Sequence, residues 1–292
     1  MKERRTDLAQ EAKELWEESA EKSKELQGVK ATEENYENFS LSRVEILNEE
    51  GEQALGKPKG LYISLSLGED WIGEAFLQWV EVLAKELGEL LKDFPEKAPV
   101  LVVGLGNEAV TPDAVGPKVQ SLTAVTRHLV SQIPEHFQHL RPVSAIPAGV
   151  LGTTGVESFE IIRGITEEIS PACIVAVDAL ASRSLDRVCR TVQLANTGIT
   201  PGSGVGNHRG RLDEESLGRP VIAVGVPTVV DGATLVADLL GQETLELEGG
   251  DFFVTPKEID SQVEKLSKLI AYGINLALNP SLTMEDIEFL VG

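Results

Sequence analysis

The chain has 292 residues, enough for one large α/β domain or two ordinary ones. A hydrophobic fraction of 42% with 25% charged residues excludes a disordered chain and indicates a sizeable core. The formal net charge of −21 disfavours direct binding to nucleic acid or an anionic membrane, and two cysteines are too few for a disulfide framework. The N-terminus has no apolar signal-peptide segment, and no stretch is long enough to span a membrane, so we expect a cytoplasmic protein.

The first part of the chain, residues 8–67, is predicted to be an N-terminal arm followed by a strand-rich lead-in. Residues 7–27 are rich in Glu, Lys, Ala and Leu with few apolar positions, which predicts a solvated helix with a narrow packing stripe. Short strands are expected at Arg43–Leu47 and Leu61–Leu67, because turn residues separate these runs. From Phe76 to Leu91, apolar residues recur at helical spacing, so this segment should form a helix that packs on a sheet.

Further along the chain, apolar runs alternate with helical patterns in the manner of a parallel sheet wound with helices. The expected strands are Val100–Val103, Val143–Ile146, Ile174–Val177, Thr191–Leu194 and Val221–Val226. The expected helices are Gly116–Gln132, Val156–Ile169, Ala233–Leu240 and Pro256–Asn279. No repeat or low-complexity linker divides this span. The sequence therefore predicts a single three-layer αβα domain over residues 8–292, with a mostly parallel, doubly wound sheet.

The first candidate for chemistry is the loop GLGNEAVTPDAVGP, residues 104–117, which follows an apolar strand and contains Asp113. In open α/β sheets, reactive groups gather at the carboxyl ends of the strands. The glycines of this loop allow tight turns, and its prolines stiffen the path around the carboxylate. The alternative is that Asp113 only caps the following helix.

The second candidate is CIVAVDALASRS, residues 173–184, in which an apolar strand is expected to end at Asp178. A carboxylate in such a place is costly unless it is solvated, paired or functional. The alternative is an ordinary loop residue after a buried strand. Because Asp113 and Asp178 would both follow strands of one sheet, the two carboxylates can open into the same crevice.

The third candidate is the Gly-rich loop NTGITPGSGVGNHRG, residues 196–210, which could offer backbone N–H groups to a substrate main chain or to a developing oxyanion. Such a composition is also that of an ordinary surface loop. We expect Asn107, Ser203, Gly204 and Asn207 to be the substrate-binding residues of these loops.

Other chemistries find little support in the sequence. The Gly-rich loop is not followed by GK[ST], and GLGNEA does not have the dinucleotide-binding spacing GxGxxG. The four histidines form no HExxH motif, Ser203 lies outside a GxSxG motif, and neither cysteine has a catalytic signature. We therefore expect carboxylate chemistry without a metal or another cofactor.

Many blocks of the sequence resemble, in order, those of the germination protease family of endospore-forming bacteria. They include RTDLAQEA, GLGNEAVTPDAVGP, VDALASRS, TGITPGSGVGN, LGRPVIAVGVPTVVDGAT and FFVTPKEID. The resemblance implies an endopeptidase that initiates degradation of small acid-soluble spore proteins during germination. It also implies that Asp113 and Asp178 are the catalytic pair, and that the fold is phosphorylase/hydrolase-like and related to hydrogenase-maturation peptidases.

The same resemblance implies how the protein is made and where it works. The family forms a homotetramer in the cytoplasm of the forespore, the later spore core. It is made as a zymogen, so residues 1–7 would be a short propeptide, cut near the bond between Asp7 and Leu8. No membrane or nucleic acid would be a direct partner.

The mechanism expected for such a pair is water activation, in which an ionised aspartate accepts a proton from water and a protonated one polarises the scissile carbonyl. Which of the two carries the proton is left open, because their titrations are coupled. Two other functions are kept as alternatives. One is a metal-dependent maturation peptidase of the related fold, and the other is an inactive scaffold that binds spore proteins.

Overall fold

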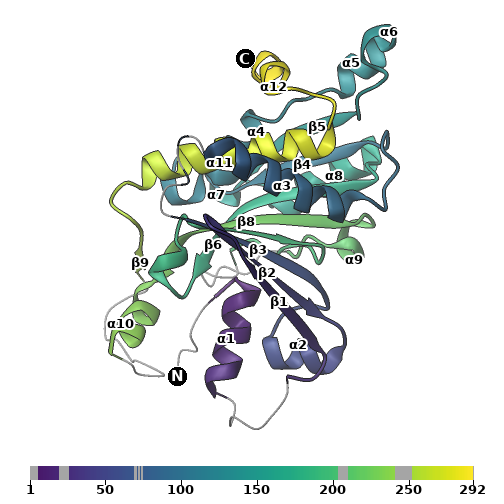
Figure 1. Cartoon of the computed structure of the whole chain (residues 1–292). Coiled ribbons are helices and arrows are strands. Elements are labelled where there is room, and N and C mark those ends of the chain that lie inside the picture. Colours follow the sequence, from purple (N-terminus) through teal and green to yellow (C-terminus); the bar gives the residue numbers. More distant parts are fainter. Residues whose placement is uncertain are drawn as a thin grey trace.

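The structure is a computed structural model that describes residues 6–19, 26–68, 71, 73, 75–202, 210–240 and 252–291. Its strands form one sheet in the order β1-β2-β3-β7-β8-β6-β4-β5, with β9 paired to β8 (Figure 1). The strands are β1 (Val29–Asn35), β2 (Phe39–Ile46), β3 (Gly60–Leu67), β4 (Val100–Leu105), β5 (Val143–Gly149), β6 (Cys173–Ser182), β7 (Thr191–Ala195), β8 (Val221–Asp231) and β9 (Phe253–Val254).

Helices lie before, between and after these strands. They are α1 (Ala9–Ser19), α2 (Glu49–Leu55), α3 (Ala75–Leu91), α4 (Val115–Ser121), α5 (Arg127–Gln132), α6 (Pro134–Phe137), α7 (Leu151–Thr154), α8 (Ser158–Ile169), α9 (Glu214–Leu217), α10 (Gly232–Leu240), α11 (Ile259–Leu278) and α12 (Met284–Val291). Short 3₁₀ turns, η1 (Thr111–Asp113) and η2 (Leu185–Arg187), interrupt two of the loops. None of the helices in the described ranges is long and apolar enough to cross a membrane.

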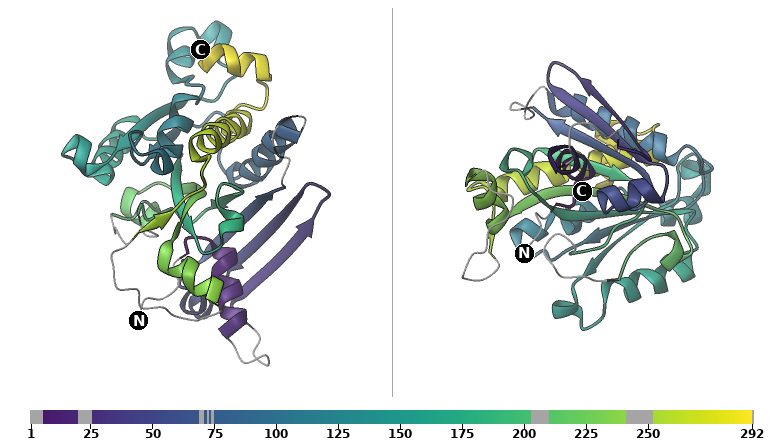
Figure 2. Two further views of the ribbon diagram at one scale, coloured as in Figure 1. Left: turned by 90° about the vertical axis from the view of Figure 1, so that its left-hand side faces the viewer. Right: turned by 90° about the horizontal axis from the view of Figure 1, so that it is seen from below.

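Strands β5, β4, β6 and β8 run parallel, and helices cover both of their faces. On one face, alternate residues such as Val102 and Val175 join the core formed with α3, α4 and α11. Helices α3 and α11 lie side by side on this face (Figure 2). On the other face, Leu101 and Ile174 join a separate cluster with Ile162 of α8. These two cores on either side of the strands confirm the predicted three-layer αβα class.

The other half of the sheet is antiparallel, because β7 runs against β8 and is followed outward by β3, β2 and β1. Thr191–Leu194 was predicted to be a strand of the parallel sheet, and the predicted direction of this strand was wrong. A parallel return needs a crossover of a dozen or more residues, whereas only residues 183–190 separate β6 from β7. Helices α1 and α2 pack on one face of this extension, where Ala9, Val44 and Leu55 share a cluster.

The predicted helix Gly116–Gln132 is wrong as a single element, since α4 ends at Ser121 and α5 begins at Arg127. The intervening segment is pinned to α11: the Asn275 side chain accepts a hydrogen bond from the Ala124 N–H and donates one to the Leu122 carbonyl. These tertiary bonds satisfy backbone groups that a continuous helix would use internally. The helices predicted at 76–91, 156–169, 233–240 and 256–279 are confirmed, with bounds that differ by a few residues.

The helix predicted over residues 7–27 is present as α1, but its start is more deeply buried than a solvated helix with a narrow packing stripe would be. Within the predicted range, α1 spans Ala9–Ser19, and residues 20–25 lie outside the described ranges. Leu8, Ala9 and Glu11 are each at most 1% exposed. Glu11 is satisfied by the backbone N–H groups of Arg183 and Ser184 and by the Arg187 guanidinium. The arm is therefore docked on the β6–β7 connection through a buried carboxylate, which a pattern of apolar residues does not reveal.

Candidate active site

Asp113 lies in the loop between β4 and α4, which folds back on itself immediately after the strand. Gly106 has φ +107°, and a Cβ on it would lie 2.1 Å from the Asp113 carbonyl oxygen, so only glycine fits there. The Asn107 N–H donates to Asp113 Oδ2 at 2.8 Å and to the Asp113 carbonyl at 3.1 Å. This backbone contact orients the carboxylate.

The outer side of the same loop is fastened to α11. Thr111 Oγ1 donates to Asp260 Oδ1 at 2.8 Å, and Lys118 forms an ion pair with Glu264 at 2.8 Å. On the inner side, a Cβ on Gly116 would lie 2.6 Å from the Val177 carbonyl oxygen. The loop thus packs against the residue that precedes Asp178.

Asp178 lies within β6, because the strand continues to Ser182, and the expectation that the strand ends at Asp178 was wrong. The neighbouring strand β4 is the one that ends: its last partner on β6 is Val177, which pairs with Gly104. Asp178 is therefore the first β6 residue beyond that pairing, and it is 4% exposed. Its Oδ1 accepts a hydrogen bond from the Ala179 N–H at 3.0 Å.

Both aspartates line one cavity of about 390 Å³ at the carboxyl edge of the parallel strands. Most of its wall is apolar, and the described residues that line it are Asp7, Leu105, Gly106, Val110, Pro112, Asp113, Ser158, Asp178, Ala179, Leu180, Ala181, Pro201, Gly202, Thr228, Val229 and Phe253. Carboxylates in such surroundings can exchange a proton with a bound water. The arrangement suits hydrolysis with one general base and one general acid.

The other predicted site residues have different outcomes. Asn107 uses its side-chain oxygen to accept a hydrogen bond from the Ala109 N–H, so its observed contacts shape the loop. Ser203, Gly204 and Asn207 lie outside the described residues. Their predicted role in binding substrate stays a prediction, although Pro201 and Gly202, which precede them, line the cavity.

Sequence reasoning missed two polar residues of the cavity, namely Ser158 and Thr228. Ser158 donates to the Gly149 carbonyl and thereby links the start of α8 to the end of β5. Nothing in the local pattern of Thr228, within the long strand β8, marks it. Asp7 was expected only as a residue of the propeptide cut, and its place in the wall of the cavity was not predicted.

Asp7 and Thr6 are held at this cavity by several hydrogen bonds. The Asp7 N–H donates to the Ala181 carbonyl at 3.0 Å, and the Ala181 N–H donates to Asp7 Oδ2 at 2.9 Å. Lys57 Nζ donates to the carbonyls of Thr6 and Asp7 at 3.2 and 3.0 Å, and Gln193 Nε2 donates to the Asp7 carbonyl at 3.3 Å. Burial lowers the pKa of the Lys57 ammonium, an effect that nearby Asp7 and Glu11 oppose.

Thiols and metal ions are the other groups that commonly serve as centres of hydrolysis. Burial raises the pKa of both the Cys173 and the Cys189 thiols to about 12, so each is protonated near neutral pH and a poor nucleophile. Within the described ranges, no three His, Cys, Asp or Glu side chains are grouped so that they could hold a metal ion.

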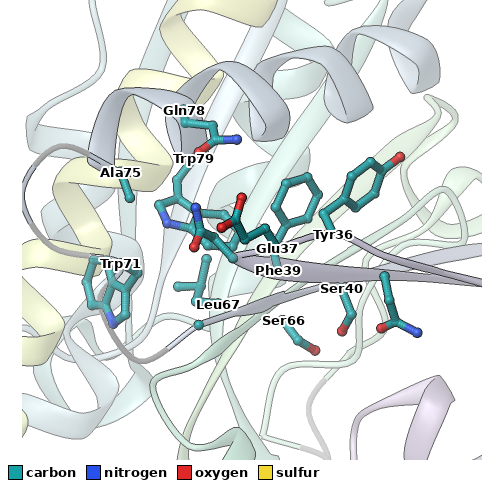
Figure 3. A pocket seen from close by; sticks show the side chains of 13 residues that line it. Tyr36, Glu37, Phe39, Ser40, Ser66, Leu67, Trp71, Ala75, Gln78 and Trp79 are labelled. Atoms are coloured by element: carbon teal, nitrogen blue, oxygen red, sulfur yellow. The ribbon is translucent and has the colours of Figure 1, made fainter.

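A larger cavity of about 830 Å³ lies between the β1–β2 turn, the end of β3 and the start of α3 (Figure 3). Aromatic side chains such as Phe39, Trp71 and Trp79 line it, and Glu37 is the one carboxylate among its lining residues. Hydrolysis by a pair of carboxylates would need a second carboxylate, which the described lining of this cavity does not contain. Chemistry, not size, therefore selects the smaller cavity as the candidate active site.

The carboxyl edge of the parallel strands is where enzymes of this αβα architecture bind their ligands, and the carboxylates that line this cavity suit acid–base chemistry. The sequence profile of the family described as germination protease matches residues 6–242. The chain belongs to the germination protease family, and is thus a peptidase.

Curated relatives agree with this assignment over almost the whole chain. The germination protease of Clostridium perfringens (strain ATCC 13124) is 45% identical over 320 aligned positions, covering 97% of this chain and 98% of the relative. The germination protease of Caldanaerobacter subterraneus subsp. tengcongensis is 42% identical, with 98% of each chain covered. The germination protease of Priestia megaterium is also 42% identical, covering 97% of this chain and 76% of the relative.

Proposed function

We propose that this peptidase is an endopeptidase of spore germination that cleaves small acid-soluble spore proteins, with Asp113 and Asp178 activating the attacking water. The observation that carries the proposal is the shared cavity, in which both carboxylates lie at the carboxyl edge of neighbouring parallel strands. Membership of the germination protease family supports the biological setting.

In the proposed reaction, one carboxylate accepts a proton from water while the other, protonated, donates a hydrogen bond to the scissile carbonyl oxygen. This mechanism requires one of the two carboxylates to be ionised and the other to be protonated when the substrate is bound. The N–H groups of Asn107 and Ala179 each accompany one carboxylate and hold its orientation. The proton returns to the leaving amine when the peptide bond breaks.

The test is cleavage of a purified small acid-soluble spore protein by wild-type, Asp113→Asn and Asp178→Asn chains. Each substitution should lower kcat by roughly 10³-fold or more, because it removes a group that acts only on the reacting atoms. Asp186→Asn is the matched control, since Asp186 is exposed on η2 and outside the cavity. Turnover retained by both cavity variants, with thermal unfolding unchanged, would refute the assignment of the pair.

Several further proposals come from the family resemblance. Residues 1–7 would be a short propeptide that is cut at the bond between Asp7 and Leu8, and the position of Asp7 in the cavity supports a cut by the chain itself. Mass spectrometry of the N-terminus should find this cut in the wild type and not in Asp113→Asn.

The enzyme would act as a homotetramer in the cytoplasm of the spore. Sedimentation of the purified protein would test whether it forms the tetramer.

The net charge of −21 supports action on substrate that has left DNA, without direct contact to nucleic acid. A metal-dependent peptidase and an inactive scaffold are the two competing functions. Cleavage that persists in strong chelator would exclude the first, and any specific cleavage would exclude the second.

A further inference from the structure

Strand β6 has an edge that the sheet itself does not use. Its pairing with β8 continues to Ser182, but its pairing with β4 stops at Val177. Among the described strands, none covers the β4 side of residues 179–182. Ala179 and Ala181 in this stretch both line the cavity that contains the two aspartates. An uncovered strand edge of this kind is a template for an extended polypeptide.

The N-terminal segment already uses this edge. The Ala181 carbonyl accepts a hydrogen bond from the Asp7 N–H at 3.0 Å, and the Ala181 N–H donates one to Asp7 Oδ2 at 2.9 Å. The segment pairs with the edge through one main-chain bond and one side-chain bond, while its own carbonyls are held by Lys57 and Gln193. A main chain therefore fits beside β6 at this point, next to Asp178.

This segment shares two contacts with the rest of the arm: Gln193 binds both the Asp7 carbonyl and the Ala9 N–H, and Thr6 Oγ1 donates a hydrogen bond to Glu11. The other bonds of Glu11 do not involve Thr6 or Asp7. Ala9 N–H donates to Gln193 Oε1, and Glu11 binds the backbone of the β6–β7 connection. Helix α1 can stay in place when Thr6 and Asp7 leave the edge. The edge can thus be vacated without unfolding the arm.

We propose that the stretch of β6 around Ala181 forms the main-chain binding edge of the peptidase, while the Ala179 N–H stays with Asp178. An extended polypeptide substrate adds there as a short strand beside Asp113 and Asp178, and Thr6–Asp7 occupies the same place in the uncut chain. The proposal rests on the proposed function for the identity of the substrate but not for the existence of the edge. Main-chain pairing positions the scissile bond without demanding a particular side chain at every position.

The protection of the edge amides can be measured by hydrogen exchange of the full-length chain, followed by mass spectrometry on fragments that span residues 179–183. Asp7→Ala removes the acceptor of the Ala181 N–H, and Lys57→Met removes the hydrogen-bond donor to the Thr6 and Asp7 carbonyls. Both should raise exchange in this fragment roughly tenfold, as expected when a hydrogen bond that protects an amide opens. Lys59→Met is the matched control, because it loses the same charge from an exposed position. Exchange over β4 should not change in any of them.

A synthetic peptide with the sequence of residues 1–8 is then added to the Asp7→Ala chain that also carries Asp113→Asn, so that no cleavage occurs. The peptide should restore protection of residues 179–183, and the same peptide methylated on the Asp7 nitrogen should not, because it lacks the N–H for the Ala181 carbonyl. A small acid-soluble spore protein should protect the same residues.

The proposal is overturned if the peptide binds by fluorescence anisotropy yet leaves exchange at 179–183 unchanged, or if the methylated peptide protects equally well. It is also overturned if the peptide fails to bind. Failure of the proposed function looks different: the wild-type chain would then leave the spore protein intact, while the peptide still protected the edge.

Discussion

Asp113 and Asp178, the two proposed catalytic residues, are positioned by opposite structural means. Asp178 lies in the middle of a buried strand with β8 along one side, and the ladder fixes its backbone. Asp113 lies on a 3₁₀ turn, and its position depends on a glycine turn at Gly106, a backbone bond from Asn107 and a tether to Asp260. The position of Asp178 is therefore held by the whole sheet, whereas the position of Asp113 depends on a few contacts. Substitutions at a distance should therefore affect the site mainly through Asp113.

The largest effect that tests this comparison is expected from Gly106→Ala. A Cβ at Gly106 would lie 2.1 Å from the Asp113 carbonyl oxygen, and φ of +107° is strained for alanine. The loop must move, and displacing Asp113, the proposed acid or base, by about 1 Å can cost on the order of 10²-fold in rate. We expect kcat for the spore protein to fall by roughly that factor.

The control for this change is Gly164→Ala, because a Cβ there meets nothing within 4 Å and the position is an exposed one in α8. It should leave kcat unchanged and, by reducing the flexibility of the unfolded chain, raise the melting temperature slightly. If Gly106→Ala kept full activity with a normal melting temperature, the loop would be more adaptable than the comparison allows.

A smaller effect is expected when the tether on the outer side of the loop is removed. Asp260→Ala leaves Thr111 Oγ1 without its acceptor on α11. A single hydrogen bond at the surface contributes about 1 kcal/mol, so kcat should fall by roughly threefold to fivefold. Glu264→Ala, which breaks the Lys118 ion pair one turn further along α11, is the comparison variant and should have a weaker effect. Equal losses in both would indicate a general loosening of α11 and not a specific tether of Asp113.

The same contrast explains what could be predicted from sequence. The apolar runs of β4, β6 and β8 and the helices between them are local patterns, and they located both aspartates near the carboxyl edge. The direction of β7, the break at Leu122 to Thr126 and the docking of Glu11 depend on partners far along the chain, such as Asn275 and Arg187. The uncovered part of β6 was missed because a run of apolar residues does not show where the neighbouring strand stops.

The smallest effect on activity is expected from substitution of the buried thiols of Cys173 and Cys189, because these side chains are buried but have no proposed catalytic role. Their pKa is about 12 in the folded chain against an ordinary value of 9.0, so between pH 9 and 12 the folded state binds more protons than the unfolded state. The stability that the protonated thiols contribute is fully present below pH 9 and is lost as the pH rises towards 12. Cys173→Ala should flatten this fall in the free energy of unfolding, measured by urea denaturation across that range, and should leave kcat at pH 7 within about twofold, since the substitution removes only a small buried group. A large loss of kcat with normal stability would mean that Cys173 takes part in the reaction, and the carboxylate pair would no longer account for the chemistry alone.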